Sequence, residues 1–453
     1  MVAVCLGFKS SAIGSCGRIV AADFSRIERT QLLHPIDPSD WQLGNGTFGL
    51  SNPKQSMSEA SLIRILAINS GSSSLKVALY EIGKIEKLLV AIEVRRIGIP
   101  AGRIRASDAR GETLFDREVR LPDHVAALNT VLKWLRGENH EIGAVGHRVV
   151  HGGPHYSGPQ VITAGVVSAL RELTPIDPDH LPQAISAIEA VRREHPSLIQ
   201  VACFDTAFHR QMPRVAQVCP LPAHFYQDGV LRYGFHGLSY EYVISELRRL
   251  DGELADGRIV IAHLGNGASM AALHQGKSVD TSMGFTPTAG LLMGTRSGDI
   301  DPGVLLYLIE EKRMSAKTVN HLLNKDSGLL GVSGISEDMQ DLLERANSDP
   351  RAALAIELFC LRARKYLGAY AALLGGLDAV VFTAGIGEHA PEVRERICSG
   401  LQFMGIRLDP ARNLETAPVI SAKSSQVKVR VIKTNEELMI ARHTARLMAS
   451  QRS

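Results

Sequence analysis

The chain has 453 residues, a length that predicts two domains on usual domain sizes. Its apolar fraction of 45% and charged fraction of 21% are ordinary for a globular enzyme, and a net charge of +3 is too small to indicate a nucleic-acid or anionic-membrane partner. No stretch reaches the roughly 18 uninterrupted apolar residues of a membrane span, so no membrane partner is expected. The six scattered cysteines form no C-x-x-C pair, which argues against zinc and disulfides and predicts a reducing cytoplasm.

Residues 1–61 differ from the rest of the chain. They mix Ser, Gly, Asn and Pro with isolated apolar residues, and no strand or helix period lasts. The segment lacks the basic and apolar regions of a secretory signal. We expect an N-terminal extension that is disordered or precedes the true start of translation, with Met57 as the simplest start. A peptide from residues 1–56 in native protein, found by mass spectrometry, would contradict that start.

One local pattern occurs twice from residue 63 onward. A buried strand, a tight turn and a returning strand cover 63–68, 69–73 and 75–80, and then 259–262, 263–267 and 269–273. The turn glycines Gly71 and Gly265 are 194 residues apart (265 − 71), which is too long a period for a solenoid. The repeat predicts two related domains.

Helical periods and further buried strands alternate along the rest of the chain. The predicted helices cover 123–136, 183–194, 352–374 and 436–448. The predicted strands cover 142–149, 198–204, 379–383 and 427–432, with a turn at 385–387. This alternation indicates an α/β fold, in which the loops at strand ends are available for ligands.

Both repeated turns have residues that suit an anion. The first, from Asn69 to Lys76, combines serine hydroxyls with a lysine, although a Ser-rich turn is most often only a turn. The second, from His263 to Gly267, lets backbone approach a phosphate, although Asn-Gly is also the commonest hairpin turn. Neither is a Walker A motif. Two equivalent turns that face each other would form a phosphate clamp between domains.

Charged or imidazole side chains follow other strands. Arg148 ends a buried strand before a Gly-Gly turn and suits an anion. His147 and His151 have the spacing of helical metal ligands, but the segment reads as a strand. Asp205 ends a very apolar strand, where the alternative role is a helix cap. His236 lies between two glycines and can hydrogen-bond a transferring phosphoryl group.

The segment 293–302 carries the most chemical information. It sets Arg296 on a Gly-bounded turn, with Asp299 and Asp301 close behind. A guanidinium on such a turn can clamp an oxyanion with two N–H groups. The alternative is a solvated surface turn with an Arg–Asp pair. The repeated turns, Arg148 and His236 favour the clamp, with the two carboxylates as supports of the loop rather than metal ligands.

Eight ordered segments resemble those of the acetate kinase family, which belongs with the sugar kinases, actin and the heat-shock chaperone ATPases. They are INSGSSSLK at 68–76, GHRVVHGG at 146–153, FDTAFH at 204–209, YGFHGLS at 233–239, HLGNGAS at 263–269, MGTRSGDIDP at 293–302, TAGIGE at 383–388 and TNEEL at 434–438. The resemblance implies two duplicated actin-like (ribonuclease H-like) domains with an interdomain active-site cleft. Domain I would be 62–207 plus 435–453, and domain II, which binds the nucleotide, would be 208–434.

The resemblance also implies an activity and a set of site residues. The activity is reversible Mg²⁺-dependent transfer of the γ-phosphoryl group of ATP to acetate, giving acetyl phosphate and ADP by direct in-line transfer in a cytoplasmic homodimer; Mn²⁺ can replace Mg²⁺. By motif, it assigns catalysis to Arg148, Asp205, His236 and Arg296, with His236 and Arg296 stabilising the transition state; substrate binding to Arg148, Val150, His180, Phe235 and Pro287; ATP binding to Lys76, Ser72, Ser74, His263, Leu264, Gly265, Asn266, Gly267, Asp338, Met339, Gln340, Gly385, Ile386, Gly387 and Glu388; and metal binding to Asn69 and Glu436.

Two positions depart from the family's usual sequence. Asp179 stands where a leucine commonly lines the acyl pocket, and an unpaired carboxylate buried there would cost on the order of several kcal/mol. That departure puts the preference for acetate in question. Gln340 stands where an arginine is usual beside the nucleotide, which predicts altered nucleotide affinity. A propionate or butyrate kinase is therefore an alternative, and a nucleotide-driven chaperone or actin-like binding protein is a more distant one.

Overall fold

The computed structural model describes residues 62–71 and 73–451 of the chain. The predicted extension at 1–61, the start at Met57 and the candidate residue Ser72 lie outside the described residues. In the part that is described, no helix is long and apolar enough to cross a membrane.

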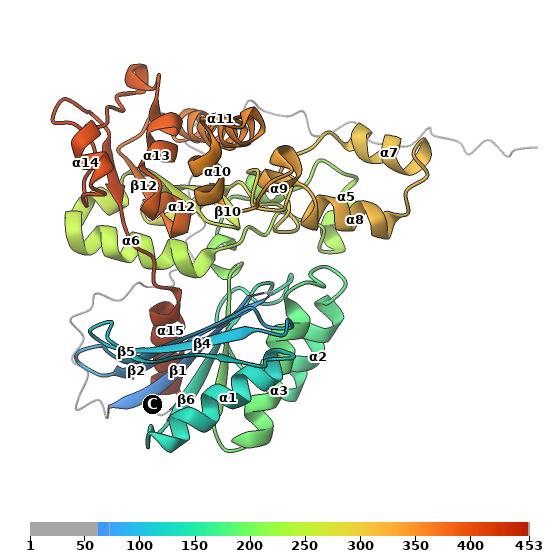
Figure 1. Ribbon diagram of the computed structural model, residues 1–453, viewed down its shortest axis with the longest axis vertical. Coiled ribbons are helices and arrows are strands. Elements are labelled where there is room, and N and C mark those ends of the chain that lie inside the picture. Colours follow the sequence, from blue (N-terminus) through green and yellow to red (C-terminus); the bar gives the residue numbers. More distant parts are fainter. Residues whose placement is uncertain (1–61, 72, 452–453) are drawn as a thin grey trace, which may run out of the picture. The chain divides into compact units, whose positions relative to one another are not determined.

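The first sheet is covered by helices on both faces (Figure 1). Its strand order is β5-β4-β3-β2-β1-β6-β8-β7. Alternate residues of β1 point to opposite faces, so Leu66 packs with helices α1 and α3 whereas Ile65 and Ala67 pack with α15. The elements are β1 (Ile63–Ser70), β2 (Ser74–Ile82), β3 (Lys87–Arg95), β4 (Gly102–Asp108), β5 (Thr113–Val119), α1 (His124–Gly137), β6 (Ala144–Val149), β7 (Gln160–Val161), α2 (Ala164–Leu173), α3 (Leu181–Glu194), β8 (Ile199–Phe204) and α15 (Glu436–Ser450).

The second sheet has the order β11-β10-β9-β12-β13. Val260 and Ala262 of β9 pack with helix α11, and Ile259 and Ile261 pack with helix α6 on the other face. The elements are α6 (Gly237–Asp251), β9 (Arg258–Leu264), β10 (Ala268–His274), β11 (Lys277–Thr281), α11 (Pro350–Leu373), β12 (Ala379–Thr383) and β13 (Lys428–Val431).

The two sheets repeat one topology, which confirms the predicted duplication and the α/β class. The order β3-β2-β1-β6-β8 in the first sheet corresponds to β11-β10-β9-β12-β13 in the second. In each, the first three strands are antiparallel and the last three run parallel. Asn69 and His263 occupy matching places at the ends of β1 and β9. The domain boundaries at 207/208 and 434/435 stay a prediction.

Shorter elements connect and surround the sheets. They are η2 (Ala207–His209), α4 (Arg214–Gln217), α5 (Ala223–Gln227), η3 (Gly252–Asp256), α7 (Pro302–Glu310), α8 (Ala316–Lys325), α9 (Gly328–Ser333), α10 (Met339–Arg345), α12 (Ala384–His389), α13 (Pro391–Cys398), η4 (Gln402–Met404) and α14 (Pro410–Leu414).

One local prediction is wrong: residues 385–387 are not a turn but part of helix α12. Ala384 begins this helix with a positive φ of 65°, and its backbone N–H donates to Glu388 Oε1 at 2.9 Å. The carboxylate thus satisfies an N–H at the start of the helix, which a glycine-rich sequence alone does not reveal. Strands β3 to β5 also have no counterpart in the sequence-based prediction; charged residues interrupt the apolar pattern of β4 and β5, whereas β3 has a continuous apolar run at 88–92 that the prediction missed.

Helix α15 lies against β6 at a position that only glycine permits. A Cβ atom on Gly146 would lie 2.4 Å from Thr444 Oγ1 and 2.5 Å from Ile440 Cγ2. Close packing here sets the place of α15, whose first residue is Glu436.

We expect Gly146→Ala to lower the free energy of unfolding by about 1–3 kcal/mol, because α15 must move away from β6. Gly368→Ala in α11 is the matched control, since no atom lies within 4 Å of its added Cβ. The control should be neutral or slightly stabilising. Urea unfolding of both variants measures the difference, and equal free energies would contradict the packing argument.

Candidate active site

Three strands of the first sheet end in a connected polar network. Asp205, fully buried just after β8, holds Arg148 of β6 with both oxygens, at 3.1 and 3.0 Å from Nε and 2.5 Å from Nη2. Arg148 Nη1 also donates to Asn69 Oδ1 of β1 at 3.0 Å. Burial disfavours the charged guanidinium, but Asp205 and Glu436 outweigh it and raise the pKa of Arg148. Arg148 is therefore a fixed, permanent cation, and Asp205 is not a simple helix cap.

Helix α15 adds two carboxylates to this network. Asn69 Nδ2 donates to Glu436 Oε2 at 2.8 Å and to Glu437 Oε1 at 2.9 Å. Glu436 Oε2 lies 4.0 Å from Arg148 Nη1. Burial would raise the pKa of Glu436, but Arg148 and His263 lower it overall, so the carboxylate stays ionised. The predicted metal candidates Asn69 and Glu436 are thus in direct contact.

Two imidazoles, one just before α6 and one on β9 of the second sheet, stack beside this network. The rings of His236 and His263 are 4.1 Å apart at an angle of 18°. Each Nδ1 lies 2.8 Å from a serine hydroxyl, Ser269 for His236 and Ser239 for His263. Burial lowers the pKa of His263 to about 4, and burial next to His263, Arg148 and Arg296 lowers that of His236 well below 6.5. Both rings are therefore neutral at physiological pH.

Two polar side chains of the part built on the second sheet, Arg296 and His236, lie close to Gly267. A Cβ atom on Gly267 would lie 2.8 Å from Arg296 Nη2 and 3.3 Å from His236 Nε2. The turn is tight, because Gly265 N–H donates to the Gly267 carbonyl at 3.1 Å. The missing side chain at Gly267 is what lets the guanidinium and the imidazole approach a common point.

Arg296 is a partly buried cation without a bonded counter-ion. Its Nη1 donates to the Pro287 carbonyl at 2.7 Å, and it forms no ion pair with any carboxylate of residues 62–71 and 73–451. Burial lowers its pKa to about 10, with Asp177 and Asp179 opposing and Arg148 reinforcing that effect. A partly buried guanidinium without a counter-ion favours an incoming anion.

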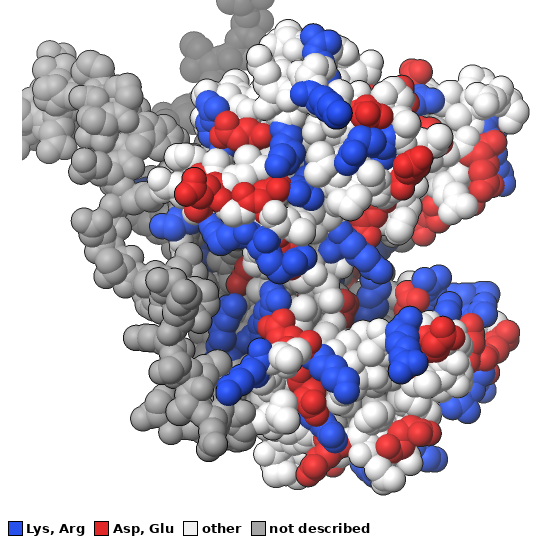
Figure 2. All heavy atoms as spheres, turned by 90° about the vertical axis from the view of Figure 1, so that its left-hand side faces the viewer, with Lys and Arg blue, Asp and Glu red and all other residues white. Residues whose placement is uncertain are grey.

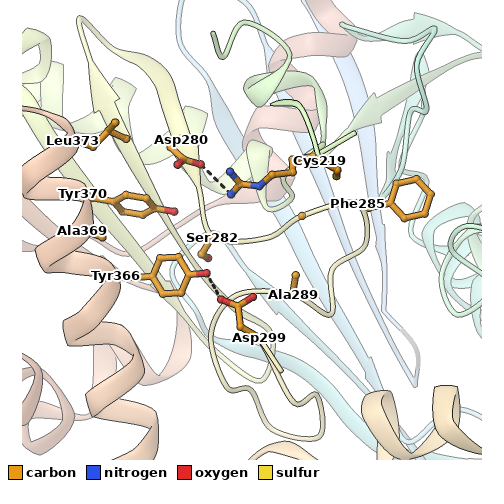
Figure 3. Close-up of a pocket in the computed structure, with 12 residues that line it drawn as sticks. Cys219, Asp280, Ser282, Phe285, Ala289, Asp299, Tyr366, Ala369, Tyr370 and Leu373 are labelled. Carbon is orange, nitrogen blue, oxygen red and sulfur yellow. Dashed lines mark hydrogen bonds and ion pairs between the residues drawn. The ribbon is translucent and has the colours of Figure 1, made fainter. Parts of the chain in front are cut away.

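Hydrogen bonds to neighbouring segments hold the loop that carries Arg296 in place. Asp299 Oδ1 accepts from Gly290 N–H at 2.8 Å, and Tyr366 donates its hydroxyl to the other oxygen (Figure 3). Thr295 Oγ1 donates to the Asn324 carbonyl at 2.8 Å. Asp301 caps helix α7 by accepting from the N–H of Gly303. The Arg–Asp pair of the surface-turn alternative does not form, although residues 299–301 are exposed, and both carboxylates hold the loop backbone instead.

A backbone contact joins the two halves at the site. Gly237 N–H, next to His236, donates to the Asp205 carbonyl at 2.9 Å, and a Cβ on Gly237 would lie 2.1 Å from that oxygen. His236 therefore sits beside the residues that hold Arg148. On the face drawn in Figure 2, Lys and Arg side chains gather along the line where the halves meet.

The predicted substrate residues lie around the same point. Val150 and Phe235 are buried in one apolar cluster, and Pro287 contacts Arg296. His180 Nδ1 lies 2.7 Å from Asp177 Oδ1. Asp179, whose side chain is 43% exposed, forms an ion pair with Lys325 of α8 at 2.9 Å. Asp179 is thus paired and partly solvated, and it is not an unpaired buried carboxylate.

Among the predicted nucleotide residues, the two glycine segments lie close together, and the others lie on several different elements. Gly265 lies 4.0 Å from Gly385 N, measured from its added Cβ, and Gly385 itself faces open space, so the two glycine segments are neighbours. Ser74 and Lys76 lie on β2, and Leu264 is the last residue of β9. The backbone carbonyl of Asn266 accepts from Gly294 N–H, and Met339 is buried. Ile386 and Gly387 lie in α12. Asp338 caps α10, and Gln340 Nε2 lies 3.3 Å from Glu344. Glu388 accepts backbone N–H groups of Ala384 and Thr434.

Sequence reasoning missed four contributors to the site. Glu437 accepts from Asn69, Gly237 contacts Asp205, and Ser269 and Tyr240 continue from His236 through hydroxyl groups. One signal was available: Tyr240 stands four residues after His236 at the start of a helix, a spacing that places both on one face.

Comparison with known proteins identifies the family of the chain. Residues 64–442 match the acetokinase family. The acetate kinase of Rhodopseudomonas palustris (strain TIE-1) is 49% identical over 395 residues, covering 84% of this chain and 98% of its own. The acetate kinase of Porphyromonas gingivalis superposes with a TM-score of 0.76 at 40% identity, covering 85% of this chain and 100% of its own. A propionate kinase from Francisella tularensis superposes with a TM-score of 0.79 at 36% sequence identity, covering 85% of this chain and 99% of its own.

The family match, the relatives and the fold thus place the molecule among the enzymes that transfer phosphoryl groups to carboxylates. The chain belongs to the acetokinase family.

Buried neutral histidines make the fold sensitive to acid. Burial lowers the pKa of His147, His151, His209 and His263 to about 4. Between pH 6.5 and 4 the unfolded chain takes up protons that the folded chain does not, so stability is complete above pH 6.5 and falls as the pH drops.

We expect His147→Gln to reduce this pH dependence by about one proton, or about 1.4 kcal/mol per pH unit. Urea unfolding between pH 7.5 and 5 measures the slope. The exposed His155, replaced by Gln, is the control and should keep the wild-type slope. Identical slopes in both variants would show that His147 is not held neutral.

Proposed function

We propose that this protein catalyses reversible transfer of the γ-phosphoryl group of ATP to acetate, giving acetyl phosphate and ADP. The observation that carries the proposal is the convergence of Arg296 Nη2 and His236 Nε2 above Gly267, beside the fixed cation Arg148. Family membership and relatives named acetate kinase support it. Such an enzyme would work in the cytoplasm, as its sequence predicts.

The chemistry needs positioning and charge neutralisation more than proton transfer. A carboxylate oxygen is already a nucleophile at neutral pH. It attacks the γ-phosphorus while the bond from phosphorus to the bridging oxygen breaks, and the electron pair leaves with ADP. No general base is required, which fits a site of cations and neutral imidazoles.

The two arginines have different tasks in this proposal. Arg148, fixed by Asp205, orients the acyl carboxylate. Arg296 binds the equatorial oxygens of the transferring group, which supply the counter-charge it lacks. Arginines that act on transferring phosphoryl groups contribute about 10³–10⁵ in rate. His236 Nε2 donates to the same oxygens. The two glycine segments around Gly265 and Gly385 receive the nucleotide.

Mg²⁺ fits the carboxylates at the start of α15. Among the described residues no three His, Cys, Asp or Glu side chains gather as a closed cage, but Mg²⁺ beside a nucleotide needs only one or two carboxylates and the phosphates. Glu436 is ionised and partly buried next to Glu437, and Asn69 donates a hydrogen bond to each of the two carboxylates. Bound there, Mg²⁺ or Mn²⁺ would neutralise phosphate charge; direct ligation by Asn69 stays a prediction.

The acyl chain is proposed to be acetate. The ion pair of Asp179 with Lys325 removes the sequence-based reason to doubt that preference. A propionate kinase fold at TM-score 0.79 keeps propionate as the second candidate.

A hydroxamate assay with ATP, Mg²⁺ and C2–C4 carboxylates tests the activity. We expect acyl hydroxamate with acetate as the best acid. Arg296→Ala should lower turnover by about 10³ or more, because the transition-state charge loses its partner. Arg351→Ala, which removes an exposed arginine paired with Asp349, is the control with normal turnover. No hydroxamate from any acid would reject the proposed function.

We also propose a homodimer that forms through helix α7. None of its residues is buried, and Leu306 and Tyr307 are 55% and 50% exposed. An apolar helix left uncovered in one chain fits an interface with a second copy.

Leu306→Glu should shift the protein from dimer to monomer in light scattering coupled to size exclusion, because a charge would be buried at the interface. Phe403→Glu replaces a side chain that is 82% exposed on η4 and should leave the dimer intact. A monomeric wild type, or a dimer in both variants, would exclude α7 as the interface.

A further inference from the structure

A chain of hydroxyl groups leads from the protein interior to His236. Tyr240 Oη lies 2.5 Å from Ser269 Oγ, and Ser269 Oγ lies 2.8 Å from His236 Nδ1. Tyr240 and Ser269 are completely buried, on α6 and β10 respectively. The chain ends at His236 Nε2, which has no hydrogen-bond partner within the described part of the protein and points to the space above Gly267.

A neutral His236 carries its single ring proton on either Nδ1 or Nε2. Its ring is neutral, because burial and the nearby His263, Arg148 and Arg296 lower its pKa well below 6.5. A neutral imidazole has a single N–H, so Nε2 can donate to a phosphoryl oxygen only when Nδ1 carries no proton. A ring protonated at Nδ1 would instead present a lone pair to an anionic group and repel it.

Counting donors along the chain decides between the tautomers. If Tyr240 donates to Ser269 and Ser269 donates to His236 Nδ1, every group of the chain is satisfied. If His236 Nδ1–H donates to Ser269 instead, Ser269 can either accept from Tyr240 or donate to it, and in both cases one of the two buried O–H groups is left without an acceptor among the described residues. A buried hydroxyl without a partner is disfavoured by about 1–3 kcal/mol. Burial also raises the pKa of Tyr240, so the phenol keeps its proton.

We propose that Tyr240 and Ser269 are positioning residues that hold His236 in the tautomer protonated at Nε2, aimed at the transferring group beside Arg296. The inference rests on the proposed phosphoryl transfer for its purpose, but the tautomer itself is a property of the resting protein. The stacked His263 keeps the ring plane fixed while the hydroxyl chain fixes the proton.

Nitrogen-15 NMR of protein labelled at the histidine ring nitrogens measures the tautomer directly, without substrate. The His236 signals are assigned by their loss in His236→Gln. We expect a protonated Nε2 and an unprotonated Nδ1 in the wild type at pH 7. Ser269→Ala should shift population toward the Nδ1–H form, because the hydroxyl that donates to Nδ1 is lost, and Tyr240→Phe should shift it less, because Ser269 still donates to Nδ1. A wild-type ring protonated at Nδ1 would overturn the proposal, whether or not the protein makes an acyl phosphate.

Kinetics separate this role from a merely structural one. Ser269→Ala should lower kcat about ten- to hundredfold, less than the roughly 10²–10³ for outright loss of one transition-state donor because His236 itself remains, with KM for both substrates within about twofold. Ser269→Thr keeps the hydroxyl and should recover most of kcat. Tyr240→Phe should give a smaller loss, and Tyr242→Phe, the same change two residues on in α6, should match the wild type. An unchanged kcat in Ser269→Ala would overturn the proposal.

Discussion

The buried ion pair between Arg148 and Asp205 is the constraint on which the rest of the site depends. Asp205 is fully buried and has both oxygens on one guanidinium, so removal of Arg148 would leave the Asp205 carboxylate as an unpaired buried charge. Breaking such a pair costs on the order of 3–5 kcal/mol. The Arg148 fork also fixes Asn69, and Asn69 in turn fixes Glu436 and Glu437. Three strands and one helix are thereby tied at a single point.

The two arginines of the site differ in how their charge is balanced. Arg148 has its counter-ion within the fold, and its pKa is raised; Arg296 lacks one among the described residues, and its pKa is lowered to about 10. A site that was neutral throughout would have little attraction for anions. A guanidinium without a counter-ion is a fixed cation that remains available for a ligand. Asp299 accepts from Gly290 N–H and the Tyr366 hydroxyl and thereby holds the Arg296 loop in place.

The duplicated topology serves different chemistry in its two copies. At matching strand ends, the first sheet has Asn69 and a set of carboxylates, and the second has His263 stacked on His236. Burial keeps both rings neutral, so they donate hydrogen bonds without adding positive charge to a site that already holds two arginines. The Gly237–Asp205 contact brings the two sets together.

The sequence by itself determined the α/β class, the duplication and the motif positions of Arg148, Asp205, His236 and Arg296, because apolar periodicity and glycine-bounded turns are local signals. Tertiary structure alone decided which of those charges are paired. Asp179 meets Lys325, and Asp299 meets Tyr366 rather than Arg296. Ser269 and Tyr240 reach His236 only because β10 and α6 pack side by side. The state of a buried charge depends on neighbours that are distant in sequence, and local patterns do not encode that distance.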